Sequence, residues 1–119
     1  MLAKLKHKPI EISVSEIEKL IMESNNISIF FDQNLCYKIV NNAACEHIQM
    51  KAKELLNKNI LDLFPEIVAS ANHRNLLRAL DGLSIRTTVP DRNGKLFKCR
   101  YKPIYQNGKV LGVLVTAVL

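Results

Sequence analysis

The chain has 119 residues, 48% of them hydrophobic and 24% charged, with a net charge of +6; this is the composition of one globular domain with a modest core, and its charge makes nucleic acid a partner to consider. No apolar run reaches the roughly 18 to 20 residues of a membrane-spanning helix, and no apolar segment follows the N-terminal lysines as in a signal peptide. The three cysteines, Cys36, Cys45 and Cys99, are far apart and odd in number, which argues against a disulfide framework and predicts a reducing, cytoplasmic setting.

The chain begins with a basic segment and an amphipathic helix. We expect residues 1–12 to be a flexible lead-in, because they are basic and interrupted by Pro9. A helix is predicted over residues 13–26, where either of two serine–glutamate pairs provides a capping box. Its apolar residues fall on one stripe at helical spacing: Val14, Ile17, Leu20 and Ile21.

A hairpin and a helical block follow. Residues 27–32 and 36–40 are strand-like and are separated by a tight turn. Asn41 then predicts the N-cap of a short helix over residues 43–48. Further helices are expected at residues 51–56, at 60–64, and at 66–80, the longest, which Gly82 ends. The side chains predicted to face inward from the longest helix are Ile67, Ala71, Leu76, Leu77 and Leu80.

Three strands complete the chain. They are predicted at residues 85–89, 96–105 and 110–119, and two Asn-Gly turns follow the first and second of them. The middle strand alternates, with Lys98, Arg100 and Lys102 on one face; no aromatic residue is interleaved there, so we expect a solvated face and no nucleic-acid site.

The last strand is apolar on both sides and should lie near the centre of the sheet, but the sequence does not say which side lines the core. The chain also stops within this strand, which predicts one domain cut from a longer protein.

The order of elements predicts an α+β fold: a five-stranded antiparallel sheet with helices on one face and an N-terminal amphipathic helix available to cover the other. With its motifs, this order resembles the PAS domain, the sensory module of bacterial histidine kinases and related regulators. The resemblance covers residues 27–119. It is carried by segments that are weak singly but specific in this order: Ile39–Ala44, Asn57–Pro65, Ala79–Gly82, Gly94–Phe97, Tyr101–Ile104 and Asn107–Gly112.

The sequence departs from the family pattern at two turns. Gln49 and Asn57 stand where the family often has glycine. Asparagine tolerates the left-handed conformation that such glycines provide, and glutamine tolerates it less well.

The resemblance also indicates where a ligand would lie. In PAS domains the pocket lies between the inner face of the sheet and the long helix. We predict mostly core filling there, with room at most for a small apolar ligand, lined by Phe31, Tyr37, Ile39, Leu77, Phe97, Cys99, Tyr101 and Leu114.

We considered light sensing, haem binding, and catalysis or metal binding as possible activities of this sequence. Light-sensing members carry a cysteine in the helical block, which residues 57–62 lack. Haem-binding members use a histidine of the long helix, so His73 is the candidate axial ligand, although its polar neighbours favour a position facing solvent. No spacing supports a catalytic or metal site. We therefore predict no cofactor, and no enzymatic activity of this domain.

The predicted function is a non-catalytic sensory and dimerisation module of a cytoplasmic histidine kinase in a two-component system, which relays a signal to an effector beyond Leu119. The alternative is a PAS sensor that binds a small ligand or haem. The apolar second side of the last strand predicts a homodimer, because one narrow helix stripe cannot cover a five-stranded sheet. The predicted interface residues are Ile17, Leu20, Ile21, Val113 and Val115.

Overall fold

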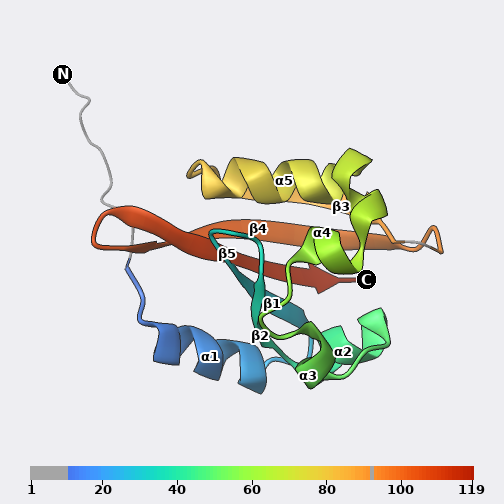
Figure 1. The fold of residues 1–119 in the computed structure, drawn as a ribbon, viewed down its shortest axis with the longest axis horizontal. Helices are drawn as coiled ribbons and strands as arrows, with labels where there is room; N and C mark the ends of the chain where they lie inside the picture. The colour runs from blue at the N-terminus through green and yellow to red at the C-terminus, as the bar shows by residue number, and fades with distance from the viewer. Residues whose placement is uncertain (1–10, 92) are drawn as a thin grey trace.

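The computed structural model describes residues 11–91 and 93–119. Its core is a five-stranded antiparallel sheet with the strand order β2-β1-β5-β4-β3. Figure 1 shows α5 on one side of the sheet and α1 on the other. We call the side facing α5 the inner face and the side facing α1 the outer face. The predicted fold class is confirmed, with β5 in the central position expected for a strand that is apolar on both sides.

The helices begin at the caps that the sequence indicated. Ser13 caps α1 and forms the capping box with Glu16, and the Asn41 side chain caps α2. The helices, in chain order, are α1 (Val14–Glu23), α2 (Asn42–Ile48), α3 (Ala52–Leu55), α4 (Ile60–Leu63), the 3-10 helix η1 (Pro65–Ala69) and α5 (Ala71–Leu80).

The strands pair as two hairpins that meet at the centre of the sheet. β1 lies between β2 and β5, with Phe31 opposite Val113 of β5, and β4 lies between β5 and β3, with Tyr101 opposite Val115. The strands are β1 (Ile27–Asp32), β2 (Tyr37–Val40), β3 (Ile85–Pro90), β4 (Leu96–Gln106) and β5 (Lys109–Val118).

The predicted long helix over residues 66–80 is wrong, because the chain breaks at Ser70. The Ser70 hydroxyl donates to the carbonyl of Ile67 at 2.6 Å and accepts from the His73 amide at 3.2 Å, which ends η1 and caps α5. The break changes which side chains face the sheet. Leu76 is fully buried, whereas Leu77, predicted to face inward, is 45% exposed.

Two turns and one strand position place special demands on the backbone. Gln49 and Asn57, the two positions where the family often has glycine, both adopt the left-handed conformation with φ of 65°. At Gly112 the requirement is steric instead. A Cβ there would lie 2.1 Å from the carbonyl oxygen of Phe31, so β1 and β5 can approach each other only at a glycine.

Hydrophobic side chains form a separate core on each face. The inner core joins the sheet to the helical block and includes Phe31, Tyr37, Leu76, Tyr101 and Val113. The outer core is smaller and joins α1 to the sheet through Ile17, Ile21, Phe30, Ile39 and Ile104.

Candidate functional site

The eight residues predicted to line a pocket do not lie together. Phe31, Tyr37 and Tyr101 are buried in the inner core, and Cys99 packs against it. Phe97 is buried as well, beside the ring of His47. Ile39 and Leu114 instead belong to the outer core under α1, and Leu77 faces solvent. Residues of α5 line neither the hollow over β3, β4 and β5 nor the hollow beside α2.

Polar groups inside the inner core are paired with one another. The Tyr101 hydroxyl donates to the side-chain oxygen of Asn72 at 2.5 Å, and Asn75 and Cys99 lie within reach of the same hydroxyl. Burial raises the pKa of Tyr37 and of Tyr101 above the ordinary value for tyrosine, and burial also raises the pKa of the Cys99 thiol. Among the described residues, no buried side-chain nitrogen or oxygen lacks a hydrogen-bond partner. This region therefore has the character of a satisfied core.

His73 is not on the solvent face of α5 as the sequence suggested. Its side chain is only 9% exposed, since it lies on the same side of the helix as Leu76 and Leu80. No group of three or more histidine, cysteine, aspartate or glutamate side chains that suits a metal ion occurs within residues 11–91 and 93–119. His73 would thus have to act alone as a haem ligand, beside a core that is already filled.

The N-terminal helix covers only part of the outer face. Ile17 and Ile21 are buried against Phe30 and Ile39, over β1 and β2 (Figure 1). Before the helix, the Glu11 carboxylate accepts from the amides of Asn107 and Gly108 at the β4–β5 turn, at 3.2 and 3.0 Å. Glu11 and Ile12, which were predicted to be part of a flexible lead-in, therefore contact the sheet; residues 1–10 lie outside the described part.

Asn41 joins the end of α1 to the start of α2. Its side-chain oxygen accepts from the amides of Ser28 and Ala44 at 3.2 and 3.0 Å. Its side-chain nitrogen donates to the carbonyls of Ile21, Ser24 and Asn26 at 3.2, 3.2 and 2.7 Å. The buried side-chain amide of Asn41 thus fixes the positions of the end of α1, of β1 and of the start of α2 relative to one another. The sequence indicated the cap on α2 but not the bonds to α1, because those depend on tertiary contact.

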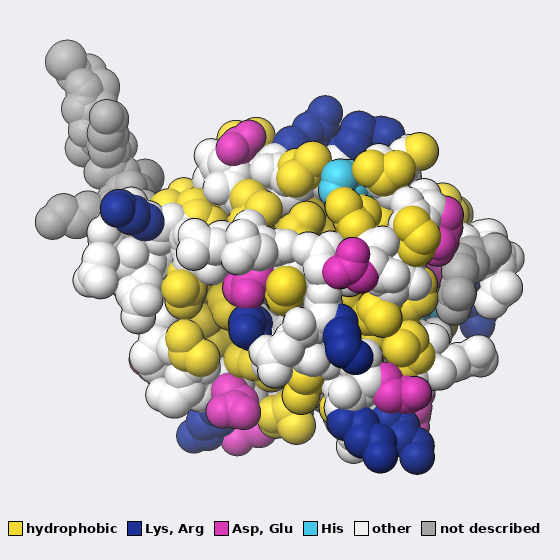
Figure 2. Space-filling model, viewed as in Figure 1, with side chains coloured by type: hydrophobic (Ala, Val, Ile, Leu, Met, Phe, Trp, Pro, Cys, Tyr) yellow, Lys and Arg dark blue, Asp and Glu magenta, His cyan; other side chains and the backbone are white. Residues whose placement is uncertain are grey.

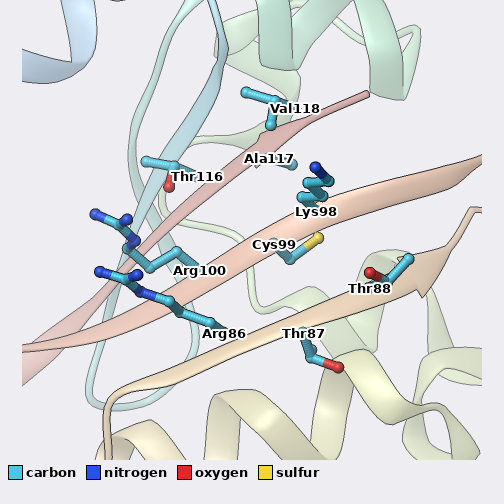
Figure 3. A pocket seen from close by; sticks show the side chains of 9 residues that line it. All are labelled: Arg86, Thr87, Thr88, Lys98, Cys99, Arg100, Thr116, Ala117 and Val118. Atoms are coloured by element: carbon cyan, nitrogen blue, oxygen red, sulfur yellow. The ribbon is translucent and has the colours of Figure 1, made fainter.

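Helix α1 also covers Ile104 of β4 and Leu114 of β5, but the outer face of β3 and of the neighbouring parts of β4 and β5 is exposed. A hollow of about 480 Å³ lies over these strands (Figure 3). We call this surface the open half of the outer face and define it by the side chains of Arg86, Thr88, Lys98, Arg100, Lys102, Thr116 and Val118. Arg86 lies directly opposite Arg100, which lies opposite Thr116. The alternation of Lys98, Arg100 and Lys102 was predicted; the contribution of Arg86 requires the strand register.

A second hollow, of about 540 Å³, lies where α2 approaches the β3–β4 turn and the last residue, Leu119. His47 Nε2 is 4.0 Å from Asp91 Oδ2, and its ring packs edge-on against Phe97 with centroids 4.9 Å apart. This arrangement places the last described residue of the chain beside the contact between the helical block and the β3–β4 hairpin.

The predicted dimer interface needs correction at four of its five residues. Val113 and Val115 are buried in the inner core, because their register with Phe31 and Ile29 points them toward α5. Ile17 and Ile21 are buried in the outer core of the same chain. Leu20 alone is free for a partner, with 56% of its side chain exposed.

Comparisons with known proteins agree with this architecture. The family model described as the PAS fold matches residues 23–118. A sensory box sensor histidine kinase from Vibrio cholerae superposes with a TM-score of 0.68 at 17% identity, covering 87% of each chain. The PAS domain of Bordetella pertussis BvgS gives 0.66 at 16% identity, covering 88% of this chain and 84% of that one.

The LOV protein of Rhodobacter sphaeroides gives a TM-score of 0.66 at 13% identity; the match covers 87% of this chain but only 64% of that one. No curated protein sequence matches the chain. Within the described residues, every helix is too short or too polar to cross a membrane. Since the family match extends over most of the chain and the sheet order agrees with it, the chain belongs to the PAS family.

Proposed function

We propose that this PAS domain is a non-catalytic sensory and dimerisation module of a cytoplasmic two-component histidine kinase, and that it relays a signal to an effector joined beyond Leu119. Sensor histidine kinases among the structural neighbours support the choice of parent protein, since a Vibrio cholerae sensor kinase shares the fold over most of both chains. A relay needs an element that responds to the core and also contacts a partner. Helix α1 packs on the core and exposes apolar side chains, which suits it to both tasks.

The observation that carries the proposal is the attachment of α1 to the sheet. The helix packs on β1 and β2 through Ile17 and Ile21, and Asn41 ties its last turn to β1 and α2. A change in the helical block can therefore reach α1 through one buried side chain. Helix α1 also exposes the apolar side chains of Val14, Leu20 and Met22, at which a second protomer could make contact.

Sedimentation of the Leu20→Arg variant tests the dimerisation part of the proposal. We expect the unchanged chain to sediment as a dimer at micromolar concentration, and the variant to be a monomer that remains folded. Leu77→Arg is the matched control, because Leu77 is also an exposed leucine of a helix but lies on α5, across the sheet. A dimer that dissociates with Leu77→Arg and not with Leu20→Arg would contradict the proposal.

The alternative function, a sensor that binds a small ligand or haem, predicts a different observation. Protein purified without added cofactor would show a Soret or flavin absorbance band, and His73→Ala would abolish a Soret band. We expect no such band, because the inner core between α5 and the sheet is filled and its polar groups are paired.

A further inference from the structure

We propose that Arg86 and Arg100, on the open half of the outer face, form a binding site for the phosphate group of a small soluble phosphate monoester. The inference goes beyond the proposed function, because it assigns a ligand to this surface and does not require two copies to associate. It also places that ligand across the sheet from α5 and the inner core.

The two arginines are held next to each other by the strand register. Arg86 of β3 lies directly opposite Arg100 of β4, which in turn lies opposite Thr116 of β5. Figure 3 shows the two guanidinium groups extending in the same direction, side by side. Like charges directly opposite each other destabilise a sheet. An anion bound between the two guanidinium groups would relieve that repulsion.

The chain supplies no carboxylate to these arginines. Neither Arg86 nor Arg100 forms an ion pair or hydrogen bond with any described residue. Within residues 83–119 the sequence has only one acidic residue, Asp91. Both of its carboxylate oxygens are engaged: Oδ1 accepts from two amides of its own turn at 2.8 Å, and Oδ2 lies 4.0 Å from His47 Nε2. The counter-ion of the two arginines therefore has to come from outside the described chain.

The charge of the open half is also of one sign, unlike that of other basic parts of the surface. Figure 2 shows basic and acidic side chains next to one another over α1 and over α2 and α3, along the lower edge of the molecule. The side chains that define the open half include four cations and no carboxylate. Lys98 and Lys102 lie two residues to either side of Arg100 on the same face of β4. Their charges add to a positive potential that attracts an anion to the arginines.

The paired guanidinium groups suit a phosphate group better than a carboxylate. A guanidinium group binds an oxyanion most strongly through two parallel N–H donors, and one such fork takes both oxygens of a carboxylate. A phosphate monoester has three terminal oxygens and a charge of about −1.5 to −2 at pH 7. It can therefore accept from two adjacent forks at once and balance both of their charges.

The hollow beside the arginines has room for the organic part of such a molecule. Its volume is about 480 Å³, and Thr88, Thr116 and Val118 contribute to its lining (Figure 3). The threonine hydroxyls can donate or accept hydrogen bonds, and the valine methyl groups offer an apolar contact. Small-molecule sites in proteins are of this size. The surroundings thus fit a small ester that is partly apolar.

A titration with phenyl phosphate, followed in amide NMR spectra at constant ionic strength, tests the site. We expect saturable shifts at Arg86, Arg100 and Thr116, with a dissociation constant in the millimolar range or below. Benzoate carries the same ring on a carboxylate. It should bind about tenfold more weakly, because it lacks the third oxygen and the second charge.

Substitution of both arginines tests whether they are the site. Arg86→Gln with Arg100→Gln should abolish the saturable shifts. The variant should unfold at a temperature no lower than that of the unchanged chain, because both positions are exposed and the like-charge repulsion is removed. Lost binding is thereby distinguished from lost folding.

Two further variants separate geometry from charge. Lys95→Gln with Lys109→Gln gives the same change in net charge as the glutamine variant, at exposed positions outside the open half. It should leave the dissociation constant within about twofold. Arg86→Lys with Arg100→Lys keeps the charge but removes the planar forks, and should bring the affinity for phenyl phosphate close to that for benzoate.

Four results would overturn the inference. Shifts that do not saturate, or that persist in the glutamine variant, would show that the arginines form no site. Equal affinity for phenyl phosphate and benzoate would show that charge alone attracts anions to this face. Sedimentation with vesicles of phosphatidylcholine and phosphatidic acid, without saturable binding of phenyl phosphate, would place the phosphate in a membrane. Sub-micromolar binding to duplex DNA near physiological salt, lost in the glutamine variant, would assign the open half to nucleic acid instead.

Discussion

The inner and outer faces of the sheet differ in how completely they are covered. The inner face packs against four helices and η1, and within the described residues no buried side-chain nitrogen or oxygen lacks a hydrogen-bond partner. The outer face carries one ten-residue helix, mainly over β1 and β2, and exposes cations over β3–β5 that form no ion pair with any described residue. A closed face gives stability, whereas a half-covered face has room for a partner. The proposed contact with a second copy is therefore placed on the outer face.

The largest expected effect tests whether the inner face is closed. Leu76→Ala should lower the free energy of unfolding by about 2 to 5 kcal/mol, because Leu76 is fully buried and its loss leaves a cavity. Leu77→Ala, one residue along the same helix, should cost less than about 0.5 kcal/mol because Leu77 is exposed. Urea unfolding measures both, and equal losses would mean that α5 is rotated relative to the sheet.

The next effect concerns the link between the two faces. Asn41→Ala should lower the free energy of unfolding by about 2 kcal/mol, since it removes a helix cap and buried hydrogen bonds. The neighbouring Asn42→Ala, at an exposed position, is the control. In hydrogen exchange, α1 amides should lose protection in the Asn41 variant while the β4 and β5 amides keep theirs. Uniform loss across the domain would show that Asn41 is a general core residue and not a specific link.

The smallest expected effect is that of the two buried tyrosines on the free energy of unfolding, and it appears only at alkaline pH. Burial raises the pKa of Tyr37 and Tyr101 in the folded protein, so the unfolded chain loses these protons first, near pH 10. Stability should be intact below about pH 10 and fall above it, by up to about 1.4 kcal/mol per pH unit for each tyrosine. The absorbance of tyrosinate should rise for these two residues only together with unfolding. Ionisation without loss of structure would mean that the inner face admits solvent.

The elements were predictable where their signals are local. The capping box of α1, the Asn41 cap and the two Asn-Gly turns each depend on a few adjacent residues, and all four occur; of the two serine–glutamate pairs that the sequence offered for the box, the structure uses Ser13 and Glu16. The break at Ser70 was missed because the apolar spacing continues through it, and the error in helix phase then placed Leu77 inside. A strand that is apolar on both sides has no alternation from which to assign faces, so Val113 and Val115 were placed on the wrong side.

The candidate site was predictable only in part, because some of its contacts depend on strand register and tertiary packing and not on neighbouring residues. The alternation of Lys98, Arg100 and Lys102 follows from strand periodicity. Arg86 joins them through the register of β3 with β4, and Asn41 reaches α1 through tertiary contact; neither is encoded in neighbouring residues. The stretch after Gly82, in which Asp91 is the only acidic residue, was a signal for the basic surface that local spacing did not use.

A dilution series of amide NMR spectra tests most directly whether two copies meet at α1. As the concentration rises through the association range, we predict shifts centred on the exposed residues of α1, including Leu20 and Met22. Amides of α5 should not move. Shifts centred on Leu77 and the rest of α5, or spectra independent of concentration with the chain a monomer throughout, would contradict the account.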